Sequence, residues 1–241
     1  AFLDSDAYPD ENWLENGIKL LKKKNIIAVG GSELDFPSQN YIEKCVSNAS
    51  KSFLVTVLNF RKNIKKEKYC DYLPSCNLIL EKKTYKIAGG MNPNLITGED
   101  WDFGDKLRKK IKGKILYSPS VKIFHKSRNL ENFFRQRFVY GEGIIDLIKN
   151  KKKPFYFFSL IFLFFLIFLL SFPIIFIFPL WGKIYINIFI FYLSIILLET
   201  IRLSKKIYFF FGTFLAILIG NITPGIGTLI KILGFNLDSK K

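Results

Sequence analysis

The sequence contains few of the residues that bind metals through sulfur or imidazole. Among 241 residues it has three cysteines and one histidine. Cys45, Cys70 and Cys76 do not have the spacing of metal ligands, and an odd number of scattered thiols is typical of a reducing compartment. We therefore expect no cysteine metal site, and any histidine ligand has to be His125.

The sequence also lacks a signal peptide and an initiating methionine. It begins at Ala1 and opens directly into an apolar and acidic pattern that is typical of a strand. We therefore expect the N-terminal part of the natural protein to be missing from this sequence.

Acidic residues are scarce relative to basic ones. There are 20 Asp and Glu against 36 Lys and Arg, which gives a formal net charge of +16. A basic protein can bind nucleic acid, a phosphorylated substrate or anionic lipid. Here the lysine runs adjoin apolar segments and lack interleaved aromatic residues on a strand platform, so we expect lipid headgroups and no nucleic-acid partner.

Apolar residues are abundant but unevenly distributed. Hydrophobic residues make up 49% of the chain, and phenylalanine alone contributes 26 residues. Residues 1–148 are mixed and charged, whereas most of residues 149–241 are Phe, Ile and Leu. The sequence therefore predicts a soluble domain over 1–148 and a membrane domain over 149–241.

The membrane domain is expected to contain two or three transmembrane helices. Residues 155–178 carry no charge, and about 20 residues suffice for one crossing. Residues 184–198 form a shorter run, and the basic residues flanking this pair predict a hairpin with the soluble domain in the cytoplasm. Residues 207–222 end at a break around Pro224, and they form either a third, broken span or a helix in the membrane interface.

The soluble half alternates strand and helix patterns, which predicts an α/β sheet. The expected strands cover residues 1–3, 26–29, 73–80, 114–117 and 121–124. The expected helices cover residues 11–24, 82–88 and 130–149. Residues 38–60 are ambiguous, and their pattern favours a helix through Tyr41, Cys45 and Val46 that extends less clearly through Phe53-Leu54. Gly30-Gly31 is expected to close the second strand, and Pro119 to separate the last two.

Asp4 and Asp6 follow the first expected strand directly. Carboxylates at the C-terminal edge of a strand border the crevice where α/β sheets bind ligands. Hard oxygen ligands in that place suit Mg²⁺ or Mn²⁺ carrying a diphosphate. The alternative is a turn or a helix cap, because Asp favours both.

A second acidic cluster opens the helix pattern after Gly98. Glu99, Asp100 and Asp102 there suit the positive end of a helix dipole, and Glu99 and Asp102 alone would serve as caps. The glycine pair before the cluster and His125 after it favour a sugar-nucleotide site in which Asp100 takes a proton. His125 is then either a metal ligand or a structural histidine at the end of a strand.

The ordered set of motifs over residues 1 to about 143 resembles the family 2 glycosyltransferases. The segment Phe2-Leu3-Asp4-Ser5-Asp6-Ala7, with Trp13-Leu14 after it, is similar to the D-x-D segment of that family. The matches to its acceptor half are Asn77, Gly89-Gly90-Met91, Gly98-Glu99-Asp100, Tyr117-Ser118-Pro119 and His125. The helix pattern with Arg135-Gln136-Arg137 and Tyr140 resembles the one that follows in membrane-anchored members.

Two features depart from the family pattern. The arginine helix has no clear Q-x-x-R-W, which argues against processive polysaccharide synthesis. The nucleotide-binding half is also absent from this sequence, and about 80–100 further residues upstream would complete a domain of ordinary size.

The resemblance implies the C-terminal part of a Rossmann-like GT-A domain and a metal-dependent, inverting hexosyltransferase. Asp100 is the implied general base, tuned by Glu99. The implied ligands of the donor are Asp4, Asp6, Arg135 and Arg137. The implied ligands of the acceptor are Asn77, Gly90 and Trp101. Asp6 and His125 would hold Mg²⁺ or Mn²⁺.

The implied donor is a nucleotide-diphosphate sugar, and the implied acceptor is a lipid-linked or membrane-proximal glycan of the cell envelope. Roles outside catalysis and substrate binding stay open for several of these residues. Arg135 and Arg137 would equally form a basic face on headgroups, and Trp13 and Trp101 would pack in a core. The rival function is a non-catalytic membrane protein whose basic cytoplasmic face binds anionic lipid or a partner, and it predicts that Asp100→Asn costs nothing.

Overall fold

The protein forms two compact units. The structure is a computed structural model, and it describes residues 1–56, 65–95, 97–151 and 159–235. Unit 1 comprises Ala1–Gln39 and Asn59–Ser127, and unit 2 comprises Asn40–Leu58 and Arg128–Lys241. The division differs from the expected boundary at residue 148, because the helix after Ser127 and the segment Asn40–Leu58 both cluster with the apolar C-terminal helices.

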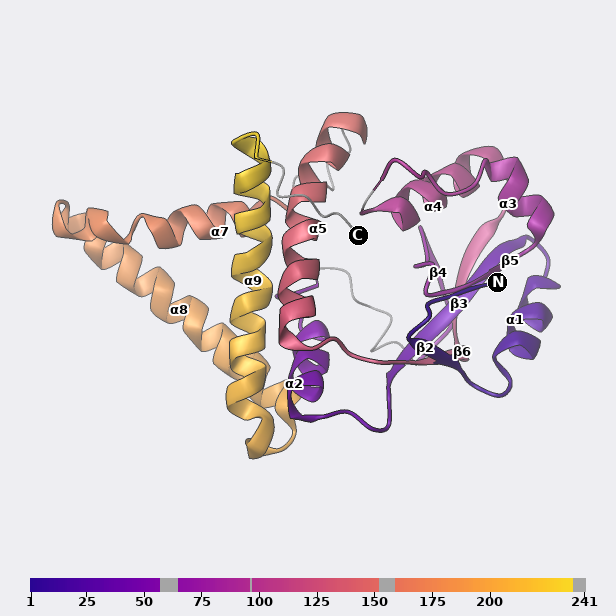
Figure 1. The fold of residues 1–241 in the computed structure, drawn as a ribbon, viewed down its shortest axis with the longest axis horizontal. Coiled ribbons are helices and arrows are strands. Elements are labelled where there is room, and N and C mark those ends of the chain that lie inside the picture. Colours follow the sequence, from indigo (N-terminus) through magenta and orange to yellow (C-terminus); the bar gives the residue numbers. More distant parts are fainter. Residues whose placement is uncertain (57–64, 96, 152–158, 236–241) are drawn as a thin grey trace. The chain divides into compact units, whose positions relative to one another are not determined.

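Unit 1 is built on a mixed sheet of six strands (Figure 1). The strands β1 (Phe2–Leu3), β5 (Asn77–Leu80), β3 (Ile26–Asp35), β6 (Lys114–His125) and β2 (Ala7–Pro9) are hydrogen-bonded in that order, and β4 (Lys68–Cys70) pairs with β6. The β3–β6 pair is parallel, and the other pairs are antiparallel. With helices α1 (Trp13–Leu21), α3 (Lys82–Ala88) and α4 (Glu99–Lys110), unit 1 has the expected α/β class.

The two faces of this sheet are covered by different helices. Leu78 and Leu80 of β5 belong to a buried cluster with Phe103 of α4, whereas Ile79 between them packs with Trp13 of α1. Successive side chains of a strand point to opposite faces, so one apolar strand serves both clusters. The apolar run of β5 is therefore the sequence signature of a strand buried on both sides.

Two strands are longer than the sequence predicts. β3 continues through Gly30-Gly31 to Asp35, and β6 continues through Pro119 to His125. A side chain at Gly31 would collide with the backbone of Ser118, so this glycine permits close approach instead of ending the strand. The β3–β6 register shifts between Gly31 and Glu33, and Pro119 lies in that irregularity, where no ladder hydrogen bond is required of it.

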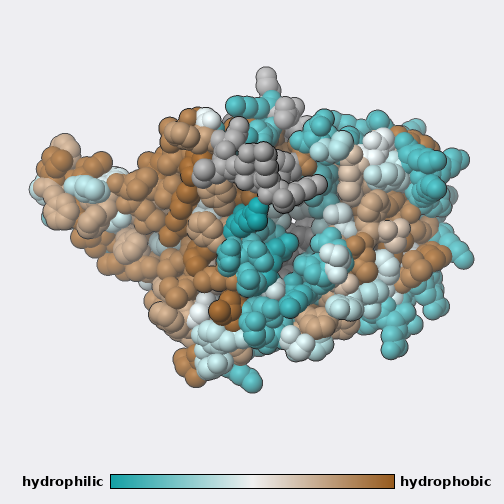
Figure 2. Space-filling view, viewed as in Figure 1, coloured by the Kyte–Doolittle hydropathy of each residue, from teal (hydrophilic) through white to brown (hydrophobic). Residues whose placement is uncertain are grey.

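Unit 2 is helical. Its elements are α2 (Tyr41–Ser50), α5 (Leu130–Lys151), α7 (Ile161–Leu170), η1 (Phe172–Phe176), α8 (Pro179–Ser204), η2 (Ile207–Phe209) and α9 (Phe210–Ile232). α2 belongs here because it packs on the start of α9, where Asn48 Nδ2 donates to Thr213 Oγ1 at 3.3 Å. Figure 2 shows hydrophobic side chains gathered over α7, α8 and α9.

Two helices of unit 2 are long and apolar enough to cross a membrane, namely α8 and the segment Ile207–Ile232. The first expected span is not one helix: residues 152–158 lie outside the described residues, and α7 ends at Leu170 before η1 begins. Prolines account for the end of this segment, because Pro173 opens η1 and Pro179 opens α8.

The expected break at Pro224 is wrong, because α9 continues through it. Proline has no N–H, so the carbonyl of Gly220 four residues earlier loses its partner within the helix. The Nε of Arg137 in α5 donates to this carbonyl at 3.2 Å. A neighbouring helix thus supplies the hydrogen bond that the proline removes.

Candidate metal centre

Three potential metal ligands meet at one end of the unit 1 sheet. Asp4 follows β1, Asp6 precedes β2, and His125 is the last residue of β6. β2 and β6 are antiparallel with Ala7 opposite His125, and the N–H of Lys126 donates to the carbonyl of Asp6 at 3.2 Å. The backbone ladder therefore fixes Asp6 beside a histidine that lies 119 residues away in sequence.

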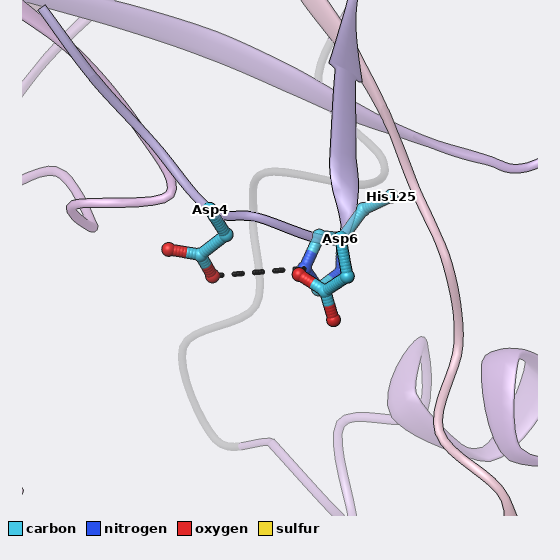
Figure 3. Close-up of side chains that lie close together, drawn as sticks. All are labelled: Asp4, Asp6 and His125. Atoms are coloured by element: carbon cyan, nitrogen blue, oxygen red, sulfur yellow. Dashed lines mark hydrogen bonds and ion pairs between the residues drawn. The ribbon is translucent and has the colours of Figure 1, made fainter.

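The side chains of this cluster converge (Figure 3). The Nε2 of His125 lies 3.1 Å from Asp6 Oδ1 and 3.6 Å from Asp4 Oδ2. One ligand atom from each of the three residues lies within 4.8 Å of the other two. The carboxylate side chains are 43% and 47% exposed and that of His125 is 13% exposed, so the histidine is held firmly and the carboxylates face solvent.

This arrangement fits a divalent cation. Ligands about 2.1 Å from one octahedral ion are about 3.0 Å apart when adjacent and about 4.2 Å apart when opposite, which brackets the two distances from Nε2. Carboxylate oxygen suits Mg²⁺ and Mn²⁺, and the imidazole shifts the preference from Mg²⁺ to Mn²⁺. Exposed carboxylates leave open coordination positions for substrate oxygens.

The second acidic cluster approaches the first through β5. Leu3, next to Asp4, pairs with Asn77 of β5, and Ser75 lies two residues before Asn77. The N–H of Ser75 donates to Asp100 Oδ1 at 2.8 Å. Asp100, at the start of α4, is therefore bound to the turn that directly precedes β5, the strand that pairs with the Asp4 segment.

The pKa of Glu99 is affected by the charge of Asp4. Burial raises the pKa of Glu99, and the negative charge of Asp4 raises this pKa further. Both Glu99 and Asp100 remain partly exposed, so a substrate hydroxyl can reach them. Within unit 1 the start of α4 is thus linked to the Asp4 segment through β5, and a site shared by the two acidic clusters stays a prediction.

The Glu99→Gln variant is expected to stabilise the metal-free protein at neutral pH. A raised pKa means that folding favours the protonated carboxyl, so the charged form costs stability above the ordinary glutamate pKa of about 4.3. The expected gain is about 0.5 kcal/mol, the scale of a partly exposed charge pair. Chemical unfolding should show this gain at pH 7 and lose it below pH 4, whereas a variant that is less stable at pH 7 would contradict the assignment.

Asp102 has a different role from its acidic neighbours. Its side chain is buried and pairs with Lys106 at 2.9 Å, and the same lysine donates to the carbonyl of Gly90 at 3.1 Å. The N-cap of α4 is Gly98 and Asp102 lies in the first turn of the helix, so Asp102 is not the cap that the sequence suggested as an alternative. The ion pair instead ties α4 to the glycine pair that follows α3.

The expected acceptor ligands lie in different environments. Asn77 is fully buried; its Oδ1 accepts from Trp13 Nε1 at 2.8 Å and its Nδ2 donates to the carbonyl of Val121 at 3.0 Å. Asn77 therefore links α1 to β6 inside the core and presents no group to a substrate. Trp101 is partly buried with its ring edge against Tyr72, and Gly90 is buried, so their roles in acceptor binding stay predictions.

The two arginines expected to bind the donor belong to unit 2. Arg135 is exposed, whereas Arg137 is buried with its guanidinium over the ring of Phe162 at 5.5 Å. Burial lowers the pKa of Arg137 to about 10, which still leaves it charged at neutral pH. The side chain of Arg137 thus has a structural use in unit 2, and its donor contact stays a prediction.

Sequence reasoning missed two residues of this region. Asp35 pairs with His125 in the β3–β6 ladder, and Ser75 holds Asp100 through its backbone. The expectation that β3 ends at Gly31 concealed Asp35. A backbone donor such as Ser75 leaves no signal in residue type.

No protein-family model matches this chain, and no curated protein matches it either. The functional assignment therefore depends on the geometry of the residues described above.

Proposed function

We propose that the protein is a membrane-anchored, metal-dependent glycosyltransferase of the GT-A type. It transfers a sugar from a nucleotide-diphosphate donor to a lipid-linked or membrane-proximal glycan, with inversion at the anomeric carbon. The observation that carries the proposal is the meeting of Asp4, Asp6 and His125, with the charge of Asp4 acting on Glu99 at the start of α4. Metal ligands and a base near one another are what direct displacement at a phosphorylated carbon requires.

In this mechanism Asp4, Asp6 and His125 would hold a divalent cation, and its charge would neutralise the leaving diphosphate. Asp100 accepts the proton of the acceptor hydroxyl as the new glycosidic C–O bond forms and the C–O bond to the diphosphate breaks. The hydrogen bond from Ser75 holds one carboxylate oxygen of Asp100, so the side chain is oriented before the acceptor arrives.

The membrane segment favours a lipid-linked acceptor. α8 and α9 expose many large apolar side chains, including Phe191 and Leu198 of α8, and such a surface is stable only in a lipid environment. A glycan carried on a lipid would be concentrated at the surface of the same bilayer. Multi-pass insertion with unit 1 in the cytoplasm is part of this proposal.

Manganese titration of the purified chain tests the metal centre. The unaltered protein should bind one Mn²⁺ per chain, followed by electron paramagnetic resonance of the free ion. Loss of a ligand in Asp6→Asn or His125→Ala should weaken binding at least about tenfold, the lower end of effects seen even for outer-sphere partners.

Glu15→Gln is the matched control, because Glu15 is exposed on α1 and lies outside the cluster. It should leave the affinity unchanged. If Asp6→Asn and His125→Ala bind Mn²⁺ as well as the control does, the cluster is only an ion pair between a histidine and two carboxylates, and the metal-dependent mechanism fails.

A further inference from the structure

Helices α5 and α9 of unit 2 run side by side in the same direction. From one contact to the next, the residue numbers increase along both helices, as they do in a parallel pair. The contacting pairs are Arg137–Gly220, Gly141–Pro224, Gly141–Thr228 and Asp146–Lys231. The second half of α9 therefore has α5 as its neighbour over several turns.

The backbones of the two helices are in close contact. A side chain at Gly141 would meet the backbone of Pro224, and one at Gly227 would meet the backbone of Phe138. The hydroxyl of Thr228 donates to the carbonyls of Gly141 and Pro224, with its Oγ1 2.9 Å from each carbonyl oxygen. This buried hydroxyl joins the two helices. Wherever the second half of α9 lies, α5 lies with it.

α5 carries charges along the face and flanks of this contact. Arg137 is buried between the helices, Glu142 is partly buried, and Asp146 pairs with Lys231 at 3.3 Å. The whole helix contains the charged residues Glu131, Arg135, Arg137, Glu142, Asp146, Lys149 and Lys151. Among the described helices, α5 is not one of those that are long and apolar enough to cross a membrane.

The charges of α5 conflict with a bilayer crossing by α9. If the segment Ile207–Ile232 crossed the bilayer, Arg137 would lie near the hydrocarbon centre opposite Gly220, and Glu142 would lie within the hydrocarbon beyond it. A charged side chain in that position is strongly unfavourable, and Arg137 has no carboxylate partner among the described residues to offset this. Length and hydropathy alone are therefore not sufficient to identify α9 as a membrane span.

The arrangement of unit 2 offers an alternative. α7 and α8 extend from α9 on the side away from α5 (Figure 1). Exposed apolar side chains cover this projecting hairpin, including Phe164, Leu170, Leu180 and Phe191. At the turn between α8 and α9, the exposed cations Lys205 and Lys206 lie beside the exposed Ile207 and Tyr208, a pattern that is typical of a membrane interface.

We propose that α9 does not cross the bilayer. With α5 it lies along the headgroup layer of an anionic leaflet, while the hairpin of α7 and α8 enters the hydrocarbon. The C-terminal end of α9 then stays on the same side of the membrane as the Lys205-Lys206 turn. This proposal is independent of the transferase activity.

Depth-dependent fluorescence quenching tests the proposal in reconstituted liposomes that contain phosphatidylglycerol. Single cysteines replace Ile207, Leu215, Ile222 or Ile232 in a background with Cys45→Ala, Cys70→Ala and Cys76→Ala, and each carries a fluorophore. Headgroup-attached quenchers should quench all four labels at least about twofold more than quenchers deep in the acyl chains. A label at Ile190 of α8 is the matched control, and deep quenchers should act on it more strongly.

The depth profile distinguishes the two arrangements. A crossing helix would place the labels at Leu215 and Ile222 deep and those at Ile207 and Ile232 shallow, and this result would overturn the proposal. A shallow label at Ile190 would overturn it as well, because the hairpin would then not enter the bilayer.

A second measurement retains the native cysteines. A topology reporter is inserted after Lys206 in one chain and fused after Lys241 in another, and both are expressed in cells. Equal reporter orientation supports the proposal, and opposite orientation contradicts it.

Discussion

The Asp100→Asn variant is expected to lose transfer activity by a factor of about 10²–10⁴, the contribution of a positioned general base. Asparagine has nearly the same shape as aspartate, and its amide oxygen still accepts the 2.8 Å hydrogen bond from Ser75, so the fold of the α4 start should persist. What disappears is the ability to accept a proton from the acceptor hydroxyl. Transfer of labelled sugar from a nucleotide-diphosphate donor to a membrane lipid extract measures this change.

Two readouts separate a lost base from a damaged site. Mn²⁺ affinity should be unchanged in Asp100→Asn, because Asp100 is not among the ligand atoms that cluster around His125. Asp105→Asn is the matched control on the same helix: the Asp105 side chain is 13% exposed, but its ion-pair partners Arg108 and Lys109 are 40% and 72% exposed, so these pairs contribute little. It should retain activity.

Full activity in Asp100→Asn would reject the catalytic mechanism proposed for this residue. Absence of any metal-dependent transfer by the natural protein with the expected upstream residues present, together with intact membrane insertion, would favour the non-catalytic, lipid-binding alternative.

The Gly141→Ala variant is expected to destabilise unit 2 by about 1–3 kcal/mol. The added methyl group would meet the backbone of Pro224, which is held in α9 and cannot rotate away as a flexible side chain can. The helices would have to separate, and the hydrogen bond from Thr228 Oγ1 to the Gly141 carbonyl would lengthen. Thermal unfolding in detergent, followed by circular dichroism at the helix signal, should show a lower midpoint.

Gly182→Ala is the matched control, because both substitutions add one methyl group to a helical glycine. At Gly182 the nearest atoms, those of Ile175, would be 3.6 Å from the new methyl group, an ordinary packing distance. Helix propensity then acts alone and should stabilise the protein by up to about 1 kcal/mol. If both variants shift the unfolding midpoint in the same direction, the α5–α9 contact is not as close as described.

Local pattern was sufficient to predict much of the secondary structure. Period and capping signals located α1, α3 and α5 to within a few residues, because a helix is stabilised by interactions between residues that are near in sequence. The same signals failed at Gly31, Pro119 and Pro224. At these positions the outcome depends on a neighbouring strand or helix that the local sequence does not reveal.

The candidate site was predictable in part. The types of residue at Asp4, Asp6, Asp100 and His125 suggest metal and proton chemistry by themselves. Asn77 illustrates the limit, since an amide that matches a motif is used here as a buried link between Trp13 and Val121. The burial of Asn77 depends on how α1 and β6 pack around it, and the spacing of motifs in the sequence does not reveal this packing.

The sequence by itself determined the division into a charged α/β part and an apolar helical part, because composition decides which segments are stable in water and which in lipid. Only the tertiary structure decided that His125 joins Asp4 and Asp6, through the antiparallel pairing of β2 with β6. It also decided that Asn40–Leu58 belongs with the C-terminal helices, and that α9 continues through Pro224 beside a charged partner. These features depend on contacts between residues far apart in the chain, and such contacts form only when the whole chain packs.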